Sequence, residues 1–216
     1  MNYIDIHTHQ ITKEDSIQLC NLSGEEMPKK QENIYYSYGI HPWDTESSNV
    51  ENALSKLKSL CENQRIIAIG ECGLDKGKGA ELAKQQEIFA KQLQIAEKHD
   101  LPLIIHTVKT QSEILALRKK YPKTPWIIHA FHGSQEMAAQ LLQHDIRLSF
   151  GAALLNPSEK WKAAFIQTPL SSLYLETDYR EISIREIYMA ATKIKELSEE
   201  ELKKAIYSNF VRDYKQ

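Results

Sequence analysis

The sequence predicts an α/β fold in which short strands alternate with helices. Apolar runs rich in β-branched residues recur at the length of buried strands. There are seven, at residues 3–6, 34–40, 66–69, 103–105, 126–128, 146–150 and 173–175. Amphipathic stretches lie between most of them, as in residues 80–99, where Leu82, Phe89 and Leu93 share one face. This alternation favours right-handed parallel crossovers.

The strand count favours a TIM-like (β/α) barrel that is slightly trimmed. Residues 16–22 form a weaker eighth strand within an otherwise irregular segment, residues 10–33. Because an eight-stranded barrel typically takes about 250 residues, a chain of 216 must have shortened or lost at least one crossover helix. An open doubly wound sheet is the alternative. Such sheets usually carry a glycine-rich phosphate turn after the first strand, whereas His7-Thr8-His9 stands there.

The end of the chain predicts C-terminal helices. Ser198 and Glu201 form a capping box for a helix that reaches about Tyr214, and Asn156-Pro157 favours another helix start. No linker, repeat or low-complexity tract interrupts the sequence. We therefore predict one domain over residues 1–216, a length at which one core can bury most of its apolar surface.

Composition and charge exclude several classes of protein. Hydrophobic residues at 42% and charged residues at 26% are close to the globular average, and no apolar run has the length of a membrane span. The formal net charge of -2 means that any attraction to nucleic acid must be local. Three scattered cysteines and a start without a signal-like stretch predict a cytoplasmic protein with no membrane partner. The oligomeric state stays open, and a monomer is compatible with the sequence.

Histidines gather at the ends of the predicted strands. Five of the eight end or follow a strand: His7, His9, His41, His106 and His129. Since the carboxyl ends of parallel barrel strands converge on one face, we expect these side chains to meet. His7 and His9 are two residues apart on an extended segment, so both rings should point to one side. Taken alone, this pair is more typical of a solvent-exposed turn.

Two carboxylates complete the pattern. Glu71 and Asp178 each follow an apolar strand, where an unpaired buried carboxylate would be costly without a cation. Four histidines with two carboxylates predict an open catalytic site for one or two divalent ions, Zn, Mn, Mg or Co. The predicted metal ligands are His7, His9, Glu71, His106, His129 and Asp178. Glu71 could bridge two ions, and Asp178 is the expected general base.

Residues around these ligands have supporting roles in the prediction. Asp5 could accept a hydrogen bond from a ligand histidine, and Asp75 is expected to support the site or its own loop. His41, Lys109 and His132 are candidate substrate-binding residues, with His41 and Lys109 suited to a phosphate. A surface position is the alternative for Lys109.

Two further residues have alternative interpretations. Trp43 follows a proline, which favours loop packing, with base stacking as the alternative. Cys72 should point away from its neighbour Glu71, since adjacent strand residues face opposite ways.

Short motifs in a fixed order resemble the TatD family of metal-dependent hydrolases, within the amidohydrolase-like barrels. They are Asp5-Ile6-His7-Thr8-His9, Gly39-Ile40-His41-Pro42, Gly70-Glu71-Cys72-Gly73-Leu74-Asp75, the Gln85/Phe89/Gln92-Leu93/Ala96 helix, Leu101-Pro102 to Ile105-His106, His129-Ala130-Phe131 and Glu176-Thr177-Asp178. The resemblance implies a TIM-like barrel, divalent metals on the six predicted ligands and hydrolysis of phosphodiesters in DNA. It also places Asn209 where the family has an asparagine in its last helix.

The departures from this resemblance surround the substrate. An arginine expected after the histidine of the fifth strand is absent, with Val108 and Lys109 in its neighbourhood. His132 stands where a serine is usual, and the chain passes from Tyr179-Arg180 almost directly to a helix, without the family's proline-containing loop.

These observations leave three functions to compare. The motifs favour a metal-dependent deoxyribonuclease or exonuclease acting on DNA. The near-neutral charge and short loops favour a barrel hydrolase of a small ester, lactone, amide or phosphoester. A non-catalytic binding module would require a lost ligand, and none of the six is lost.

Overall fold

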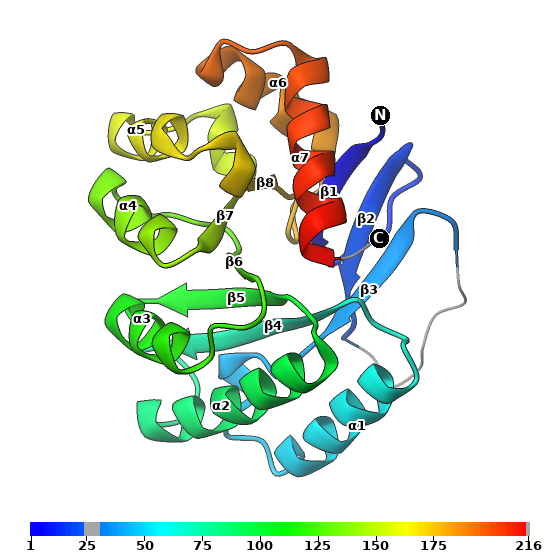
Figure 1. Ribbon diagram of the computed structural model, residues 1–216, viewed down its shortest axis with the longest axis vertical. Helices are drawn as coiled ribbons and strands as arrows, with labels where there is room; N and C mark the ends of the chain where they lie inside the picture. The colour runs from blue at the N-terminus through cyan, green and yellow to red at the C-terminus, as the bar shows by residue number, and fades with distance from the viewer. Residues whose placement is uncertain (24–30, 215–216) are drawn as a thin grey trace. The chain divides into compact units, whose positions relative to one another are not determined.

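The computed structural model describes residues 1–23 and 31–214 as parallel strands alternating with helices (Figure 1). The eight strands follow one another in the sheet in sequence order, and the pairings of β1 with β2, β3 with β4, β4 with β5, β5 with β6 and β7 with β8 are parallel. Their bounds are β1 (Tyr3–Thr8), β2 (Ser16–Asn21), β3 (Ile34–Tyr38), β4 (Ala68–Asp75), β5 (Leu103–Val108), β6 (Trp126–Ile128), β7 (Ile146–Phe150) and β8 (Leu173–Leu175). This topology confirms the predicted TIM-like (β/α) barrel class.

Seven α-helices connect or follow the later strands. They are α1 (Val50–Glu62), α2 (Leu82–His99), α3 (Gln111–Lys120), α4 (Gln135–Gln143), α5 (Glu159–Gln167), α6 (Ile184–Lys195) and α7 (Glu199–Tyr214). There are also three short 3-10 turns among the described residues. The turn η1 (Pro42–Asp44) follows β3, η2 (Ala152–Leu155) follows β7, and η3 (Leu170–Ser172) precedes β8. Among the described residues no helix joins β1 to β2 or β2 to β3, which accounts for the short chain.

The segment of residues 10–33 is more regular than predicted. β2 occupies Ser16–Asn21, so the weak eighth strand is present and pairs in parallel with β1. Ile17 and Leu19, two residues apart, are buried, and this alternation is the sequence signal for a strand. The polar residues between and beside them make the signal weak. Residues 24–30 of this segment lie outside the described part of the chain.

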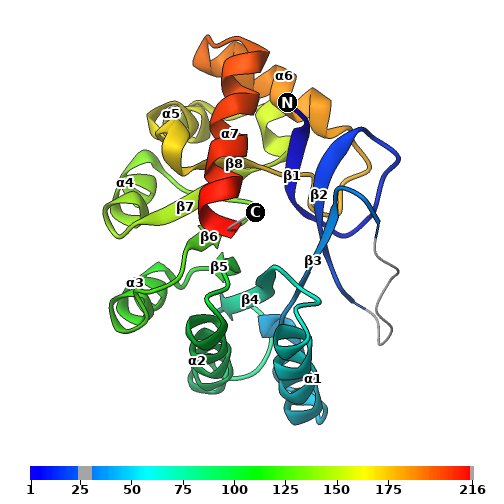
Figure 2. The ribbon, with the colours of Figure 1, turned by 45° about the vertical axis from the view of Figure 1, so that its right-hand side comes forward.

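Contacts divide the chain into two compact units. The first comprises residues 1–20, 26–35 and 129–216, and the second comprises residues 21–25 and 36–128. In the first unit, α7 packs on β1 and β8 (Figure 2). Leu202, Ile206 and Phe210 recur every fourth residue of α7 and are buried, as an amphipathic helix requires.

A buried ion pair ties the last turn of α7 to β7 and β8 in the first unit. The guanidinium of Arg147 donates to both carboxylate oxygens of Asp213 at 3.1 and 3.2 Å. The hydroxyl of Tyr174 donates to the same carboxylate at 2.9 Å. Burial alone would raise the pKa of Asp213, but Arg212 and Arg147 hold it below its usual value.

In the second unit α1 and α2 lie side by side, and α2 packs on β4 (Figure 1). Two glutamines, Gln85 and Gln92, share the buried face of α2 with Phe89 and Ala96. Gln85 accepts from the backbone N–H of Asp75 at 2.8 Å and donates to the carbonyl of Ala80 at 2.7 Å. Gln92 accepts from the N–H of Ile40 at 2.8 Å and donates to its carbonyl at 3.2 Å. The helix therefore fixes the loops that follow β3 and β4.

We expect Gln85→Ala to destabilise the protein because it leaves buried backbone groups of the Asp75 loop unpaired. The free energy of unfolding should fall by about 1–3 kcal/mol. Urea denaturation followed by circular dichroism measures it. Gln94→Ala, on the exposed side of the same helix, should change it by less than about 0.5 kcal/mol. Equal losses in the two variants would contradict the anchoring role of Gln85.

Candidate functional site

In the first unit, His7, His9 and Asp178 come together where β1 and β8 end. The N–H of Asp178 donates to the carbonyl of His7 at 2.9 Å, and the N–H of His9 donates to the carbonyl of Asp178 at 3.0 Å. These backbone bonds bring Asp178 Oδ1 to 3.7 Å from His7 Nε2 and 3.6 Å from His9 Nε2. One ligand atom from each residue lies within 4.8 Å of the others, a spacing that could hold a metal ion.

His129 lies next to His7 and adds a third imidazole to this group. The two ring centroids are 4.7 Å apart, and both side chains are buried. Glu176, fully buried, lies with Oε1 3.5 Å from His129 Nδ1 and accepts from the N–H of Ala130 at 2.6 Å. Burial would raise the pKa of Glu176, but the nearby His129 and His7 imidazoles hold it below its usual value. A charged carboxylate of this kind can orient a ligand histidine.

Glu176 was absent from the predicted ligand and supporting residues. The signal was available, because a glutamate directly follows the apolar strand residues Leu173–Leu175. The same argument that singled out Glu71 applies to it: a fully buried carboxylate needs compensating donors or charge.

Asp5 supports the segment that carries Asp178. Its carboxylate accepts from the backbone N–H of Thr177 at 3.0 Å and from the Thr177 hydroxyl at 2.5 Å. Burial raises the pKa of Asp5 to about 7, against the hydrogen bonds from Thr177 that lower it. These bonds tie β1 to the residue that precedes Asp178. The backbone of His7 also hydrogen-bonds to the Asp5 carboxylate, so Asp5 supports a predicted ligand as well.

In the second unit, Glu71 lies between two histidines. Its Oε1 is 3.0 Å from His41 Nε2 and 3.0 Å from His106 Nδ1. The two imidazole centroids are 4.6 Å apart. Ligand atoms of the three residues again lie within 4.8 Å of one another. Glu71 is buried and both rings are half-buried, so the group faces solvent only through its histidines.

Asp75 contacts the second ring nitrogen of His106. Its Oδ2 accepts from the indole N–H of Trp43 at 2.7 Å and lies 3.3 Å from His106 Nε2. Although burial would raise the pKa of Asp75, the hydrogen bonds from Trp43, from the N–H of Gly77 and from His106 hold it below its usual value. Asp75 therefore fixes the orientation of both rings.

Gly73 permits the close approach of β4 and β5 beside this group. It pairs with His106 in the parallel register, and a Cβ there would lie 2.0 Å from the His106 carbonyl oxygen. Its φ of +137° also disfavours any side chain. Neighbouring Cys72 is fully buried with its sulfur 3.5 Å from the carbonyl of Ile104, and burial raises the pKa of its thiol well above the usual value. A protonated, enclosed thiol is a poor nucleophile.

The remaining predicted substrate residues lie at exposed positions. Lys109 is exposed directly after β5, with φ of +56°. His132 is exposed in the first unit, and its ring lies 5.5 Å from that of Trp161. Neither position adds a ligand atom to the groups described above.

The donor chemistry of both groups fits a divalent metal. Imidazole nitrogens and carboxylate oxygens without thiolates are the ligands of open catalytic sites for Zn, Mn or Co, and the carboxylates also suit Mg. Buried carboxylates facing imidazoles would be stabilised further by a cation.

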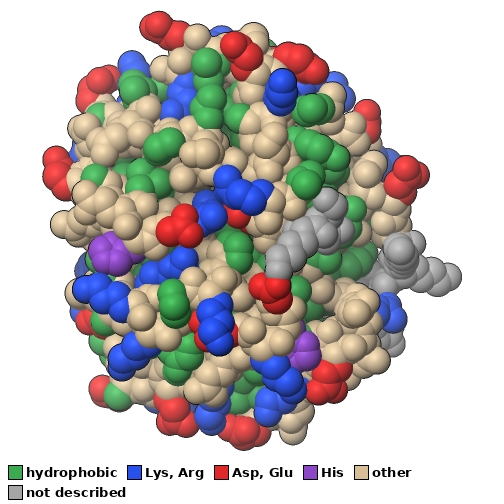
Figure 3. All heavy atoms as spheres, viewed as in Figure 1, with side chains coloured by type: hydrophobic (Ala, Val, Ile, Leu, Met, Phe, Trp, Pro, Cys, Tyr) green, Lys and Arg blue, Asp and Glu red, His purple; other side chains and the backbone are tan. Residues whose placement is uncertain are grey.

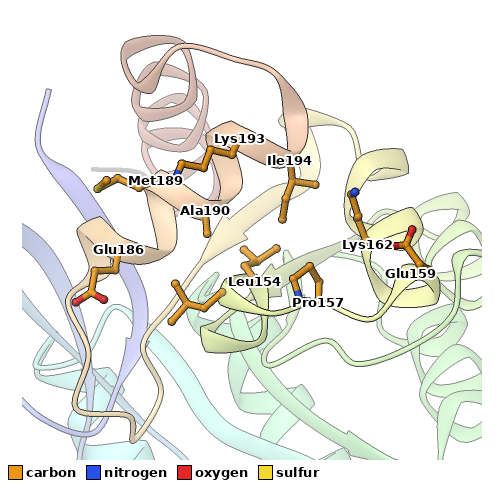
Figure 4. Close-up of a pocket in the computed structure, with 10 residues that line it drawn as sticks. Leu154, Pro157, Glu159, Lys162, Glu186, Met189, Ala190, Lys193 and Ile194 are labelled. Carbon is orange, nitrogen blue, oxygen red and sulfur yellow. The ribbon is translucent and has the colours of Figure 1, made fainter.

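A separate cleft in the first unit does not contain these residues. It has a volume of about 500 Å³ and lies between α5, α6 and the η2 turn (Figure 4). Leu154, Ala190 and Ile194 line it together with Lys162 and Glu186. No predicted ligand lines it, so it is not the candidate site.

Known proteins resemble this chain over most of its length. The family described as TatD related DNase matches residues 4–215. This chain belongs to that family. YjjV of Escherichia coli, described as an uncharacterized metal-dependent hydrolase, is 30% identical over 151 residues, which are 67% of this chain and 58% of that protein. A 3'-5' ssDNA/RNA exonuclease TatD of Cronobacter sakazakii is 28% identical over 170 residues, 76% of this chain and 62% of that protein.

The chain therefore spans less than two thirds of the length of these TatD-family relatives. The crystal structure of YjjV superposes with a TM-score of 0.85 at 21% identity, over 99% of this chain and 98% of that chain. This likeness shows the shared fold. Within the described residues, no helix has the length and apolarity needed to cross a membrane.

We expect Gly73→Ala to disturb the group around Glu71, because the added methyl group would collide with the His106 carbonyl. The free energy of unfolding should fall by more than about 1 kcal/mol, as overpacking and an unfavourable φ both predict. Gly77→Ala is the matched control, since its Cβ would meet its nearest atom at 3.2 Å. Urea denaturation compares the two, and an unchanged midpoint for Gly73→Ala would contradict the packing argument.

Proposed function

We propose that this chain is a metal-dependent hydrolase that uses one or two divalent ions to activate water and cleaves phosphodiester bonds in DNA. The observation that carries the proposal is the presence of two groups of histidine and carboxylate ligand atoms, each within 4.8 Å, at the ends of parallel strands. Family membership supports hydrolysis, and the exonuclease among the relatives supports a nucleic-acid substrate.

We assign the proposed ligands to each unit separately. His7, His9, His129 and Asp178 would hold metal in the first unit, and Glu71 and His106 in the second. A bound divalent ion supplies Lewis acidity and lowers the pKa of water. Asp178 is half-buried, so its carboxylate can face both a ligand position and incoming water. We propose that it accepts the proton of the attacking water.

The substrate residues follow from position and charge. His41 has one ring nitrogen at Glu71 and the other accepting from the N–H of Trp43 at 3.2 Å, so its ring is held firmly. We propose that His41, Lys109 and His132 contact the substrate, with His41 and Lys109 directed to phosphate oxygens. A charge-assisted hydrogen bond from Lys109 would replace the arginine that the family resemblance led us to expect.

Hydrolysis of a small ester, lactone, amide or phosphoester is the second candidate. The formal charge of -2 favours it, as does the surface, where basic and acidic side chains are intermingled on the face shown (Figure 3). Affinity for single-stranded DNA measured against salt concentration separates the two. A DNA enzyme should bind more weakly as salt rises, because phosphate contacts release counterions.

We expect the purified protein to bind one or two divalent ions and to lose hydrolytic activity in chelator. Activity should return with Mn, Mg, Zn or Co. His7→Ala should lower the bound metal, measured by elemental analysis, because His7 is a buried ligand of the first group. His144→Ala, at the half-buried C-terminal cap of α4 and outside both ligand groups, should retain the metal content of the unsubstituted protein. Chelator-insensitive turnover by metal-free protein would reject the proposal.

Asp178→Asn should retain the fold and at least one ion but lose turnover. Asparagine tolerates the φ of +57° at this position and keeps one coordinating oxygen, yet it cannot accept the proton at neutral pH. The rate constant kcat should fall roughly 10²- to 10⁴-fold.

Asp145→Asn is the matched control, because Asp145 has φ of +56° in the same unit and lies outside the ligand groups. Its turnover should be unchanged. If Asp178→Asn kept more than about a tenth of the unsubstituted rate with its metals in place, Asp178 would not be the base.

A further inference from the structure

We infer that Trp43 and Lys78 form a binding platform for the nucleobase and an adjoining phosphate of the substrate. The inference rests on the proposed function and adds to it two residues that would recognise one nucleotide unit of the substrate by its flat ring and its negative charge. Trp43 belongs to the loop after β3, and Lys78 belongs to the loop after β4.

Trp43 is the one exposed tryptophan of the three in the sequence. Its side chain is 45% exposed, whereas Trp126 and Trp161 are 0% and 3% exposed. Single exposed apolar side chains are common on protein surfaces, so exposure alone does not mark a site. The observation that points to binding is that this exposed indole is also held in one orientation, with part of its flat surface turned to solvent. The sequence favoured loop packing for Trp43, and the ring does contact His41 and Lys78 of the surrounding loops; base stacking would use its exposed part.

Two contacts hold the Trp43 ring, and a third holds its backbone. Its N–H donates to the carboxylate of Asp75 at 2.7 Å, and its backbone N–H donates to His41 Nδ1 at 3.2 Å. The ring also meets the His41 ring edge-on, with centroids 4.7 Å apart. A ring held in this way loses little conformational entropy on binding a ligand, which increases affinity.

Lys78 brings positive charge to the same place. Its ammonium lies 3.7 Å from the centre of the Trp43 ring. Among the residues that the structure describes, no carboxylate lies within salt-bridge distance of this ammonium, in contrast to Lys76, which pairs with Glu113 at 2.7 Å. Because this ammonium covers one face of the indole, a phosphate that draws it aside would open that face to the base.

Gly79 sets the distance between the two loops. Its φ is +87°, and a Cβ there would lie 2.1 Å from the carbonyl oxygen of Pro42. The N–H of Ala80 donates to the Thr45 hydroxyl at 3.1 Å, which joins the same loops. These contacts hold the backbone that carries Lys78 against the turn that carries Trp43.

The platform adjoins the candidate metal ligands of the second unit. The Trp43 and His106 ring centroids are 5.8 Å apart, and Asp75 contacts both side chains. A substrate phosphate at His41 would place a directly attached sugar and base within reach of the indole, whose centroid is 4.7 Å from that of His41. An aliphatic phosphoester would leave the ring unused, so the platform favours nucleotides over phosphate groups in general.

Intrinsic fluorescence tests the platform without relying on turnover. Because Trp43 alone is exposed, thymidine monophosphate should quench emission excited at the red edge of tryptophan absorption, and ribose 5-phosphate should quench it far less. Trp43→Phe should remove the quenching that thymidine monophosphate causes. Equal quenching by both compounds, or quenching that survives in Trp43→Phe, would overturn the inference.

Kinetics on matched dinucleotides separates this inference from the proposed function. With a thymine base beside the scissile phosphate, Trp43→Leu should raise KM roughly 5- to 100-fold, and Trp43→Phe much less. With an abasic sugar in that position, the unsubstituted protein and Trp43→Leu should have the same KM. Lys78→Ala should raise KM for both substrates, while Lys56→Ala, whose ammonium lies 4.8 Å from the centre of the Tyr38 ring, should not.

The failures of the two ideas differ. If the metal-loaded protein hydrolyses neither dinucleotide, the proposed function fails whatever the quenching shows. If it hydrolyses both with equal KM and Trp43→Leu changes nothing, hydrolysis stands and the platform is wrong.

Discussion

Burying a carboxylate costs free energy unless donors or positive charge surround it, and this requirement explains the arrangement of both groups of candidate ligands. Glu71, Glu176 and Asp5 are each less than a tenth exposed, and each meets donors that compensate its charge. Glu71 lies between two imidazoles, Glu176 faces His129, and Asp5 accepts two bonds from Thr177. The histidines are therefore oriented by the protein's own charges before any metal arrives, so binding an ion needs little rearrangement.

Much of the fold could be predicted from the sequence, because buried parallel strands are nearly continuous apolar runs. The strand at Ser16–Asn21 gave a weak signal, since its buried apolar residues alternate with the polar residues Ser16 and Gln18, which are buried as well. Strand ends were informative for the same reason, because a histidine or carboxylate after an apolar run stands out. That is how His7, Glu71, His106 and Asp178 could be singled out.

The supporting contacts could not be predicted, because they depend on distances across the sheet. Glu176 has the same sequence signal as Glu71, but its partner His129 is 47 residues away and their 3.5 Å spacing appears only in three dimensions. Asp75 looked like a loop aspartate that binds its own backbone, and it does accept from the N–H of Gly77. Its second oxygen, facing Trp43 and His106, gives it the further role.

The two buried glutamines of α2 also bear on how the proposed substrate surface can evolve. Gln85 and Gln92 bond to main-chain atoms of the loops after β3 and β4, and the side chains of Thr45 and Asp75 hold the same loops, so the loop paths do not depend on the side chains of Trp43 and Lys78 alone. Apart from Gly79, positions such as Trp43 and Lys78 can therefore accumulate substitutions without loss of the loop backbone. Selection could change substrate preference at these positions while the strand-end ligands stay in place.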